Sequence, residues 1–213
     1  MAAQVVVVNP NSIQAVTDGI RDAVTLVPGT ERLDIDCVTL AEGPPGIETD
    51  AHIAAVIPPL LTLVKSRLPE ADAFVIACFS DPGIAQLRDA LRSPVYGIGE
   101  CAYRSAAAGG RRFGVISIVA ESVPRHRRYI EHLGLDGQLA GDRPLELSVV
   151  ELSDAARTRD RLSEVARLLV GDGADALILG CAGMAAYRET LQSELGCPVI
   201  DPCQAAIRAV LAN

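Results

Sequence analysis

Short, almost uniformly hydrophobic segments alternate along the chain with longer segments in which hydrophobic residues recur at helical spacing. The short segments predict strands at 5–8, 33–38, 73–77, 95–97, 113–118, 145–150, 176–179 and 199–200. The longer segments predict helices near 12–26, 50–67, 83–91, 100–108, 121–132, 154–170, 185–194 and 204–211. Strands that lack a polar face are typical of parallel strands covered by helices on both sides. The pattern therefore predicts an α/β fold.

The second half of the chain repeats the pattern of the first half. Residues 72–78 (DAFVIAC) match residues 175–181 (DALILGC), which places Cys78 and Cys181 103 positions apart. The Pro-Val pairs that follow, at Pro94 and Pro198, are 104 positions apart, so the register holds across the unit. The repeat predicts two pseudo-symmetric Rossmann-like lobes, each with a mostly parallel sheet flanked by helices.

The two lobes determine where the active site is expected. We expect a first lobe of residues 1–97 plus 204–213, because the last helix can pack back on the first half, and a second lobe of residues 98–203. Ligands of open α/β sheets bind beyond the carboxyl ends of the strands. Cys78 and Cys181 both follow a strand, so their thiols are expected to face each other across the cleft between the lobes.

Composition narrows the class of protein. The 213 residues are 49% hydrophobic, which supplies a core and excludes a disordered chain. Aromatic residues make up 3% and the net charge is −8, which argues against nucleic acid and anionic membranes as partners. No hydrophobic run reaches the roughly 20 residues of a membrane helix, and no targeting segment is visible. A cytoplasmic location with reduced thiols is expected.

Two facing thiols allow three kinds of chemistry. A disulfide is disfavoured by a reducing compartment and by the absence of a CxxC spacing. A metal site is disfavoured because the cysteines fit no zinc spacing and because His52, His126 and His132 are expected on solvated helix surfaces. The third kind is acid/base catalysis, in which one thiolate removes a proton from a carbon and the opposite thiol delivers one to the other face. Such a pair inverts a stereocentre without a cofactor.

The residues around each cysteine suggest how the thiols are activated. Asp81 is a plausible N-cap before Pro82, which would place a helix N-terminus beside Cys78 and favour its thiolate. Gly180 and Gly183 flank Cys181, where free backbone N–H groups could hold a developing enolate. The other four cysteines are expected to be buried core residues.

Three motifs carry a resemblance to a known family: NPNS at 9–12, ACFSDPG at 77–83 and LGCAGM at 179–184. Together they resemble the hydantoin racemase branch of the aspartate/glutamate racemase superfamily, and the resemblance spans nearly the whole chain. It implies cofactor-independent and metal-free racemisation of 5-substituted hydantoins, including allantoin, by Cys78 and Cys181. It also implies a homo-oligomer.

The residues after each cysteine bear on the substrate. Amino-acid racemases of this superfamily commonly place Asn-Thr after the first cysteine and Thr-His or Thr-Glu after the second. Here Phe79-Ser80 and Ala182-Gly183 follow, which suits a small neutral ring such as a hydantoin. Arylmalonate decarboxylases are similar but keep only the second-half cysteine. The resemblance and the strand ends together give the expected substrate-binding residues: Asn9, Asn11, Phe79, Ser80, Ser117, Ile118, Val119, Ala182 and Gly183.

Several of these residues have a structural explanation as well. Asn9 and Asn11 can simply form a turn beside Pro10, and Ser80 can help to cap a helix. The loop 40–50 can be a lid or a plain connection. Other functions also stay open: an amino-acid racemase, a maleate-type cis-trans isomerase with covalent cysteine addition, a catalytically silent ligand-binding protein, or a redox module.

Overall fold

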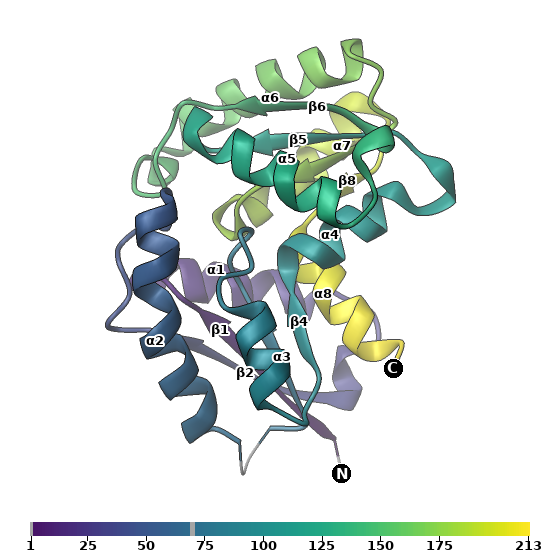
Figure 1. Ribbon diagram of the computed structural model, residues 1–213. Helices are drawn as coiled ribbons and strands as arrows, with labels where there is room; N and C mark the ends of the chain where they lie inside the picture. Colours follow the sequence, from purple (N-terminus) through teal and green to yellow (C-terminus); the bar gives the residue numbers. More distant parts are fainter. Residues whose placement is uncertain (1, 69–70) are drawn as a thin grey trace.

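The computed structural model describes residues 2–68 and 71–213 and contains two parallel four-stranded sheets (Figure 1). The first sheet has the order β2-β1-β3-β4, with β1 at Ala3–Asn9, β2 at Leu33–Thr39, β3 at Ala73–Ile76 and β4 at Val95–Gly97. The second has the order β6-β5-β7-β8, with β5 at Phe113–Ser117, β6 at Leu139–Pro144, β7 at Ala176–Leu179 and β8 at Val199–Ile200. The two strand orders match, which confirms the predicted repeat and the two-lobed α/β fold.

Helices connect and cover the strands of both sheets. The α-helices are α1 (Gln14–Thr25), α2 (Asp50–Ser66), α3 (Ile84–Ala90), α4 (Ile98–Ala107), α5 (Val123–His132), α6 (Ala155–Gly171), α7 (Arg188–Leu195) and α8 (Pro202–Leu211). The short 3-10 helices are η1 (Thr30–Arg32), η2 (Ala108–Gly110), η3 (Ala120–Ser122), η4 (Asp136–Gln138), η5 (Glu151–Ser153) and η6 (Ala182–Tyr187). Side-chain caps explain several starts, because Thr49, Asp154 and Asp201 each accept a backbone N–H in the first turn of α2, α6 and α8.

The hydrophobic run of β1 is buried on both faces. Val5 and Val7 pack with residues of α1 and α8, whereas Val6 and Val8 pack with residues of α2. This two-sided burial explains why the strand has no polar face in the sequence. Figure 1 shows α8, the yellow C-terminal helix, beside the first lobe, where it contacts α1 and α4. The division of the chain at 97–98 and 203–204 stays a prediction.

One predicted strand is wrong. The strand beside β5 is β6 at Leu139–Pro144, not the segment 145–150, which follows β6 as an irregular segment with a positive φ of 56° at Glu146. The amides of Leu145 and Leu147 donate to the carbonyl oxygens of Ser117 and Ile118, and Leu145, Leu147 and Val149 are buried. The alternating leucines therefore mark a segment of the core. The true strand is an edge strand whose residues are only half-buried, so its sequence lacks a hydrophobic run.

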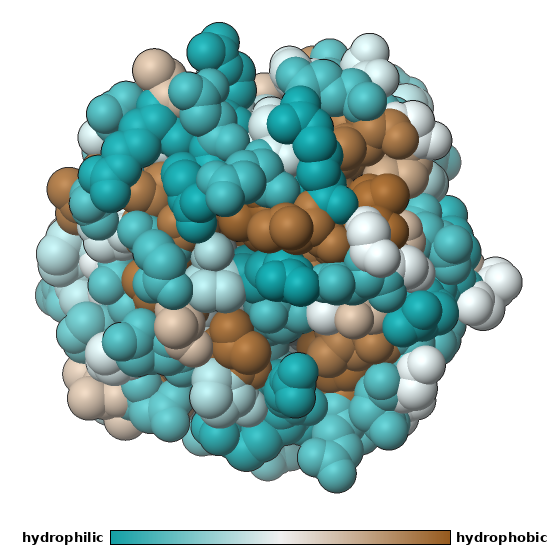
Figure 2. Space-filling view, turned by 90° about the horizontal axis from the view of Figure 1, so that it is seen from above, coloured by the Kyte–Doolittle hydropathy of each residue, from teal (hydrophilic) through white to brown (hydrophobic). Residues whose placement is uncertain are grey.

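Among the described residues, no helix is long and hydrophobic enough to cross a membrane. Seen from the side of the second lobe, hydrophobic side chains form patches between hydrophilic ones (Figure 2). The large hydrophobic side chains that are exposed are Leu26, Leu68, Val150, Leu168 and Val170.

Candidate active site

Cys78 and Cys181 line one narrow cavity of about 40 Å³ between the two lobes. Cys78 follows β3 of the first sheet and Cys181 follows β7 of the second, so the two thiols occupy equivalent positions of the repeat. Gly180 can approach β5 closely because it has no side chain: a Cβ atom there would lie 2.5 Å from the carbonyl oxygen of Ile116. Two thiols that face one cavity from opposite lobes can remove and deliver a proton on opposite sides of a ligand.

Five of the other expected binding residues line this cavity, and four do not. Those that line it are Asn11, Phe79, Ser80, Ile118 and Ala182. Asn9 is buried beneath it, where its Nδ2 donates to Asn11 Oδ1 at 3.0 Å and to Thr17 Oγ1 at 3.0 Å. Asn9 thus stabilises the turn beside Pro10, which agrees with the structural alternative given for it above. Ser117 and Val119 are not among the lining residues, and Gly183 lines a neighbouring cavity.

Asp81 does not cap the helix that follows it, so this expectation is wrong. Helix α3 begins at Ile84, after Gly83, and Asp81 itself has a positive φ of 45°. Its carboxylate reaches α4 instead, where it accepts hydrogen bonds from the amides of Gly99 (2.9 Å) and Glu100 (2.8 Å). The hydroxyl of Tyr129 donates a third bond at 3.0 Å. Asp81 therefore ties the Cys78 loop to the N-terminus of α4.

The electrostatics of the site differ from the expected helix-activated thiolate. Burial, together with a smaller effect of the nearby Asp81 carboxylate, raises the pKa of the Cys78 thiol to about 12, and a hydrogen bond from the Ser80 backbone opposes this rise. Burial, together with a smaller effect of Glu48, raises the pKa of the Cys181 thiol to about 11. The amide of Gly183 donates to Cys181 Sγ at 3.4 Å and opposes this rise. We therefore expect both thiols to be protonated at neutral pH.

The loop 40–50 contributes to the wall of the cavity and is held by the second lobe. Ile47 of the loop lines the cavity. Arg125 of α5 also lines it, and its guanidinium donates to Asp50 Oδ1 at 3.1 Å and to the carbonyl oxygen of Glu48 at 3.4 Å. The same guanidinium donates to Ser80 Oγ at 3.1 Å, beside Cys78. Arg125 thus joins two loops of the first lobe to a helix of the second, a role that the sequence did not indicate.

His126 is buried, contrary to the expected solvated position. Its Nδ1 lies 2.9 Å from Asp142 Oδ2 and 3.1 Å from Ser117 Oγ, and Ser117 also donates to Asp142. The imidazole packs edge-to-face against Phe79, with ring centroids 5.1 Å apart, and lines the cavity. The one sequence signal for this burial is the spacing of His126 and Ile130, which places both on the same helix face, away from most of the arginines. The expectation that the enzyme uses no metal stays a prediction.

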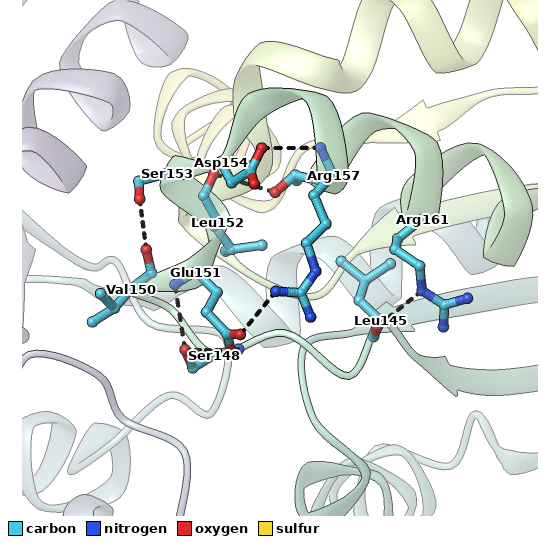
Figure 3. A network of polar contacts seen from close by, with 10 residues as sticks. Leu145, Ser148, Val150, Glu151, Leu152, Ser153, Asp154, Arg157 and Arg161 are labelled. Carbon is cyan, nitrogen blue, oxygen red and sulfur yellow. Dashed lines mark hydrogen bonds and ion pairs between the residues drawn. The ribbon is translucent and has the colours of Figure 1, made fainter.

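A polar network fixes the wall of the cavity after β6 (Figure 3). Glu151 accepts hydrogen bonds from the amide and hydroxyl of Ser148 at 2.9 Å and from Arg157 at 3.1 Å. Arg161 donates to the carbonyl oxygen of Leu145 at 3.1 Å. These contacts anchor the segment 145–153 to α6, and Val149 from this segment lines the cavity.

Known proteins of one family are similar to this chain over nearly its full length. A family model described as Asp/Glu/Hydantoin racemase matches residues 5–210. The hydantoin racemase of Paenarthrobacter aurescens is 34% identical, over 96% of this chain and 88% of that protein. The hydantoin racemase of Rhizobium meliloti is 32% identical, over 94% and 84%. The solved structure of allantoin racemase from Klebsiella pneumoniae has a TM-score of 0.92 at 30% identity, over 99% of this chain and 87% of that chain.

These matches include both sheets and both cysteine loops, and they confirm the resemblance drawn from the three motifs. The relatives identify the chain as a racemase, an enzyme of the isomerase class. With its two parallel sheets in matching strand order, the chain belongs to the Asp/Glu/hydantoin racemase family.

Proposed function

We propose that the chain racemises 5-monosubstituted hydantoins without a cofactor, with Cys78 and Cys181 as the acid and base at C5. The observation that carries the proposal is the placement of the two repeat-matched thiols on one cavity, each at the carboxyl end of an equivalent strand. The relatives named as hydantoin racemases support the same substrate class. Allantoin, named for the similar solved structure, is a hydantoin of this kind.

The reaction needs one thiolate and one thiol in each direction. The thiolate takes the proton from C5, and the electron pair left on C5 moves into the adjacent carbonyl to give an enolate. The opposite thiol then delivers its proton to the other face of C5, so the product is the other enantiomer and the charge has moved to the second sulfur. In this proposal, backbone N–H groups of the cysteine loops stabilise the enolate oxygen.

The raised thiol pKa values suit this chemistry. A thiolate with a pKa near 11 or 12 is a stronger base than an ordinary cysteine thiolate, and a weakly acidic C–H bond requires a strong base. The cost is a small thiolate fraction at neutral pH. We infer that substrate turnover proceeds through this minor form.

The lining of the cavity supports a neutral ring over an amino acid. Among the described residues that line it, Arg125 is the only guanidinium or ammonium side chain, and Asp50 already pairs with it. No carboxylate lines the cavity to meet a substrate ammonium group, within the described part of the chain. A hydantoin, which is polar but uncharged, fits such a lining better.

The test is racemisation of L-5-benzylhydantoin and (S)-allantoin, followed by circular dichroism, with deuterium incorporation at C5 in D₂O. We expect the wild type to racemise a hydantoin with exchange at C5, and Cys78→Ser or Cys181→Ser to lose the activity by at least a hundredfold. Cys101→Ser is the matched control, because Cys101 lies outside the cavity. Normal racemisation by Cys78→Ser, or turnover of glutamate or maleate in place of hydantoins, contradicts the proposal.

Assembly and location are further parts of the proposal. We propose that the chain forms a homo-oligomer in the cytoplasm and that its lobes comprise residues 1–97 plus 204–213 and residues 98–203. Sedimentation velocity of the purified protein tests the assembly, and a monomer at micromolar concentration contradicts it.

A further inference from the structure

A second, larger cavity of about 470 Å³ adjoins the thiol cavity. It lies between α1, the segment 149–153 and the start of η6 and α7. Val16, Val149 and Ala182 line both cavities, so these three side chains form the boundary between them. Its volume falls within the range of roughly 300–1,000 Å³ that is usual for small-molecule sites.

The lining of the larger cavity changes from its deep end to its mouth. The deep end is hydrophobic and buried, with Ala23, Leu152 and Ala182 each less than 9% exposed. The charged side chains Asp22 and Glu189 are exposed at the mouth, and Arg188, whose side chain is 19% exposed and pairs with Glu189 at 3.2 Å, also lines the cavity. Gln204 also lines the cavity, but its amide already donates to the carbonyl oxygen of Ala23 at 3.2 Å. A ligand group that reaches the deep end therefore meets mainly hydrophobic side chains.

We infer that this cavity receives the substituent at C5 of the substrate and selects extended hydrophobic substituents, an inference that rests on the proposed function. The thiol cavity has room for only about three waters, which is less than a hydantoin ring, so ring binding already requires this cavity to widen and leaves no space in it for a larger group. C5 must lie beside both sulfur atoms, and Ala182 follows Cys181 directly. Because Val16, Val149 and Ala182 line both cavities, a substituent that leaves C5 toward these side chains is directed at the larger cavity.

The hydrophobic side chains of the lining also predict which hydantoins are turned over with the higher kcat/KM. A benzyl or long alkyl group gains from burial in this cavity. The ureido group of allantoin carries N–H and carbonyl groups that lose water there and find few partners at the deep end, which weakens binding. We therefore expect 5-benzylhydantoin to be turned over with a kcat/KM about tenfold or more above that of allantoin.

Gly19 offers a direct test, because it lines the larger cavity and not the thiol cavity. It lies in α1, and a Cβ atom there would meet nothing within 4 Å, so a larger side chain can enter the open space. Gly171 in α6 is the matched control: it is also an exposed helical glycine with nothing within 4 Å, and it lies outside both cavities. The two variants are Gly19→Phe and Gly171→Phe.

The readout is the ratio of kcat/KM for 5-benzylhydantoin to that for 5-methylhydantoin. We expect Gly19→Phe to lower this ratio about tenfold or more, as is usual when a pocket loses room for a substituent, and Gly171→Phe to leave it unchanged. An unchanged ratio in a folded Gly19→Phe protein overturns the inference. If the ratio is unchanged and the variant also changes its oligomeric state, the cavity is an interface between copies of the chain, and the inference is overturned as well. If the wild type racemises neither hydantoin, the proposed function itself fails, which is a distinct result.

Discussion

The carboxylate of Glu48 accepts a hydrogen bond from the amide of Val149 at 2.9 Å, although 101 positions separate the two residues. Glu48 belongs to the loop that contributes to the wall of the thiol cavity, and Val149 lines both cavities on the opposite lobe. Gly46 permits this approach, since a Cβ atom there would lie 2.8 Å from Glu48 Oε1 and 3.2 Å from the Val149 side chain. The contact therefore closes the site at the point where the two cavities meet.

Loss of this contact is expected to weaken the closed state. In Glu48→Ala the loop loses its bond to Val149, and we expect kcat/KM for 5-benzylhydantoin to fall about tenfold, since a hydrogen bond to a charged group stabilises by roughly 1.5–3 kcal/mol. Glu48→Gln keeps an acceptor and is expected to retain most of the activity. Equal kinetics of Glu48→Ala and the wild type contradict a role in closure.

The thiol pKa values predict slow alkylation at neutral pH. Both values lie above the ordinary value of 9.0, because burial favours the protonated form. The thiolate fraction therefore grows about tenfold with each pH unit up to pH 10, and the iodoacetamide reaction of Cys78 and Cys181 should follow it without a plateau. Site-resolved mass spectrometry measures the rates. Glutathione is the control, and a plateau for Cys181 below pH 9 contradicts the expectation.

The same shifts predict a loss of stability at high pH. The unfolded chain releases the thiol protons near pH 9, whereas the folded chain holds them to about pH 11 or 12. The stabilisation by neutral buried thiols is therefore complete below pH 9 and is lost as the pH rises toward 12. Urea denaturation at pH 7, 9 and 10 measures this, and Cys78→Ser should show a weaker pH dependence above pH 9. An identical dependence in both proteins is the contrary result.

Gly97 is expected to be essential for the position of the Cys78 loop. A Cβ atom at Gly97 would lie 2.3 Å from Cγ of Asp81, so Gly97→Ala must displace the carboxylate from the α4 amides. We expect the free energy of unfolding to fall by about 1–3 kcal/mol, as is typical of overpacking. Gly137→Ala, where a Cβ atom meets nothing within 4 Å, is the control. Denaturation midpoints that agree between the two variants argue against this account.

Asp142 is expected to hold the imidazole of His126. In Asp142→Ala the buried His126 and Ser117 lose their shared carboxylate, and an unsatisfied buried group costs about 1–3 kcal/mol. Asp172→Ala, which breaks a partly exposed pair with Arg143, should destabilise the protein less. Chemical denaturation compares the two variants, and an equal or larger effect at Asp172 contradicts the buried role of Asp142.

The sequence predicts the parts of this protein that depend on local pattern and on the repeat. Strands such as β7, at 176–179, match their predicted bounds, because a run that is buried on both faces is hydrophobic throughout. The placement of Cys78 and Cys181 on one cavity follows from their equal positions in two parallel sheets. What the sequence misses depends on contacts between distant residues. The burial of His126 requires Asp142, which lies on an edge strand without a hydrophobic signal, and the reach of Asp81 to α4 requires its positive φ.

The larger cavity is bounded by small residues outside the thiol cavity, among them Ala15, Gly19, Ala185 and Ala186. Exchanges at these four positions change the volume available to a substituent without altering any residue beside either sulfur atom. With the proposed roles of the two cavities, reactivity and selectivity are encoded by separate sets of positions in this chain. A small combinatorial library at the four positions can therefore retune which hydantoins are accepted while the proton-transfer machinery is inherited intact.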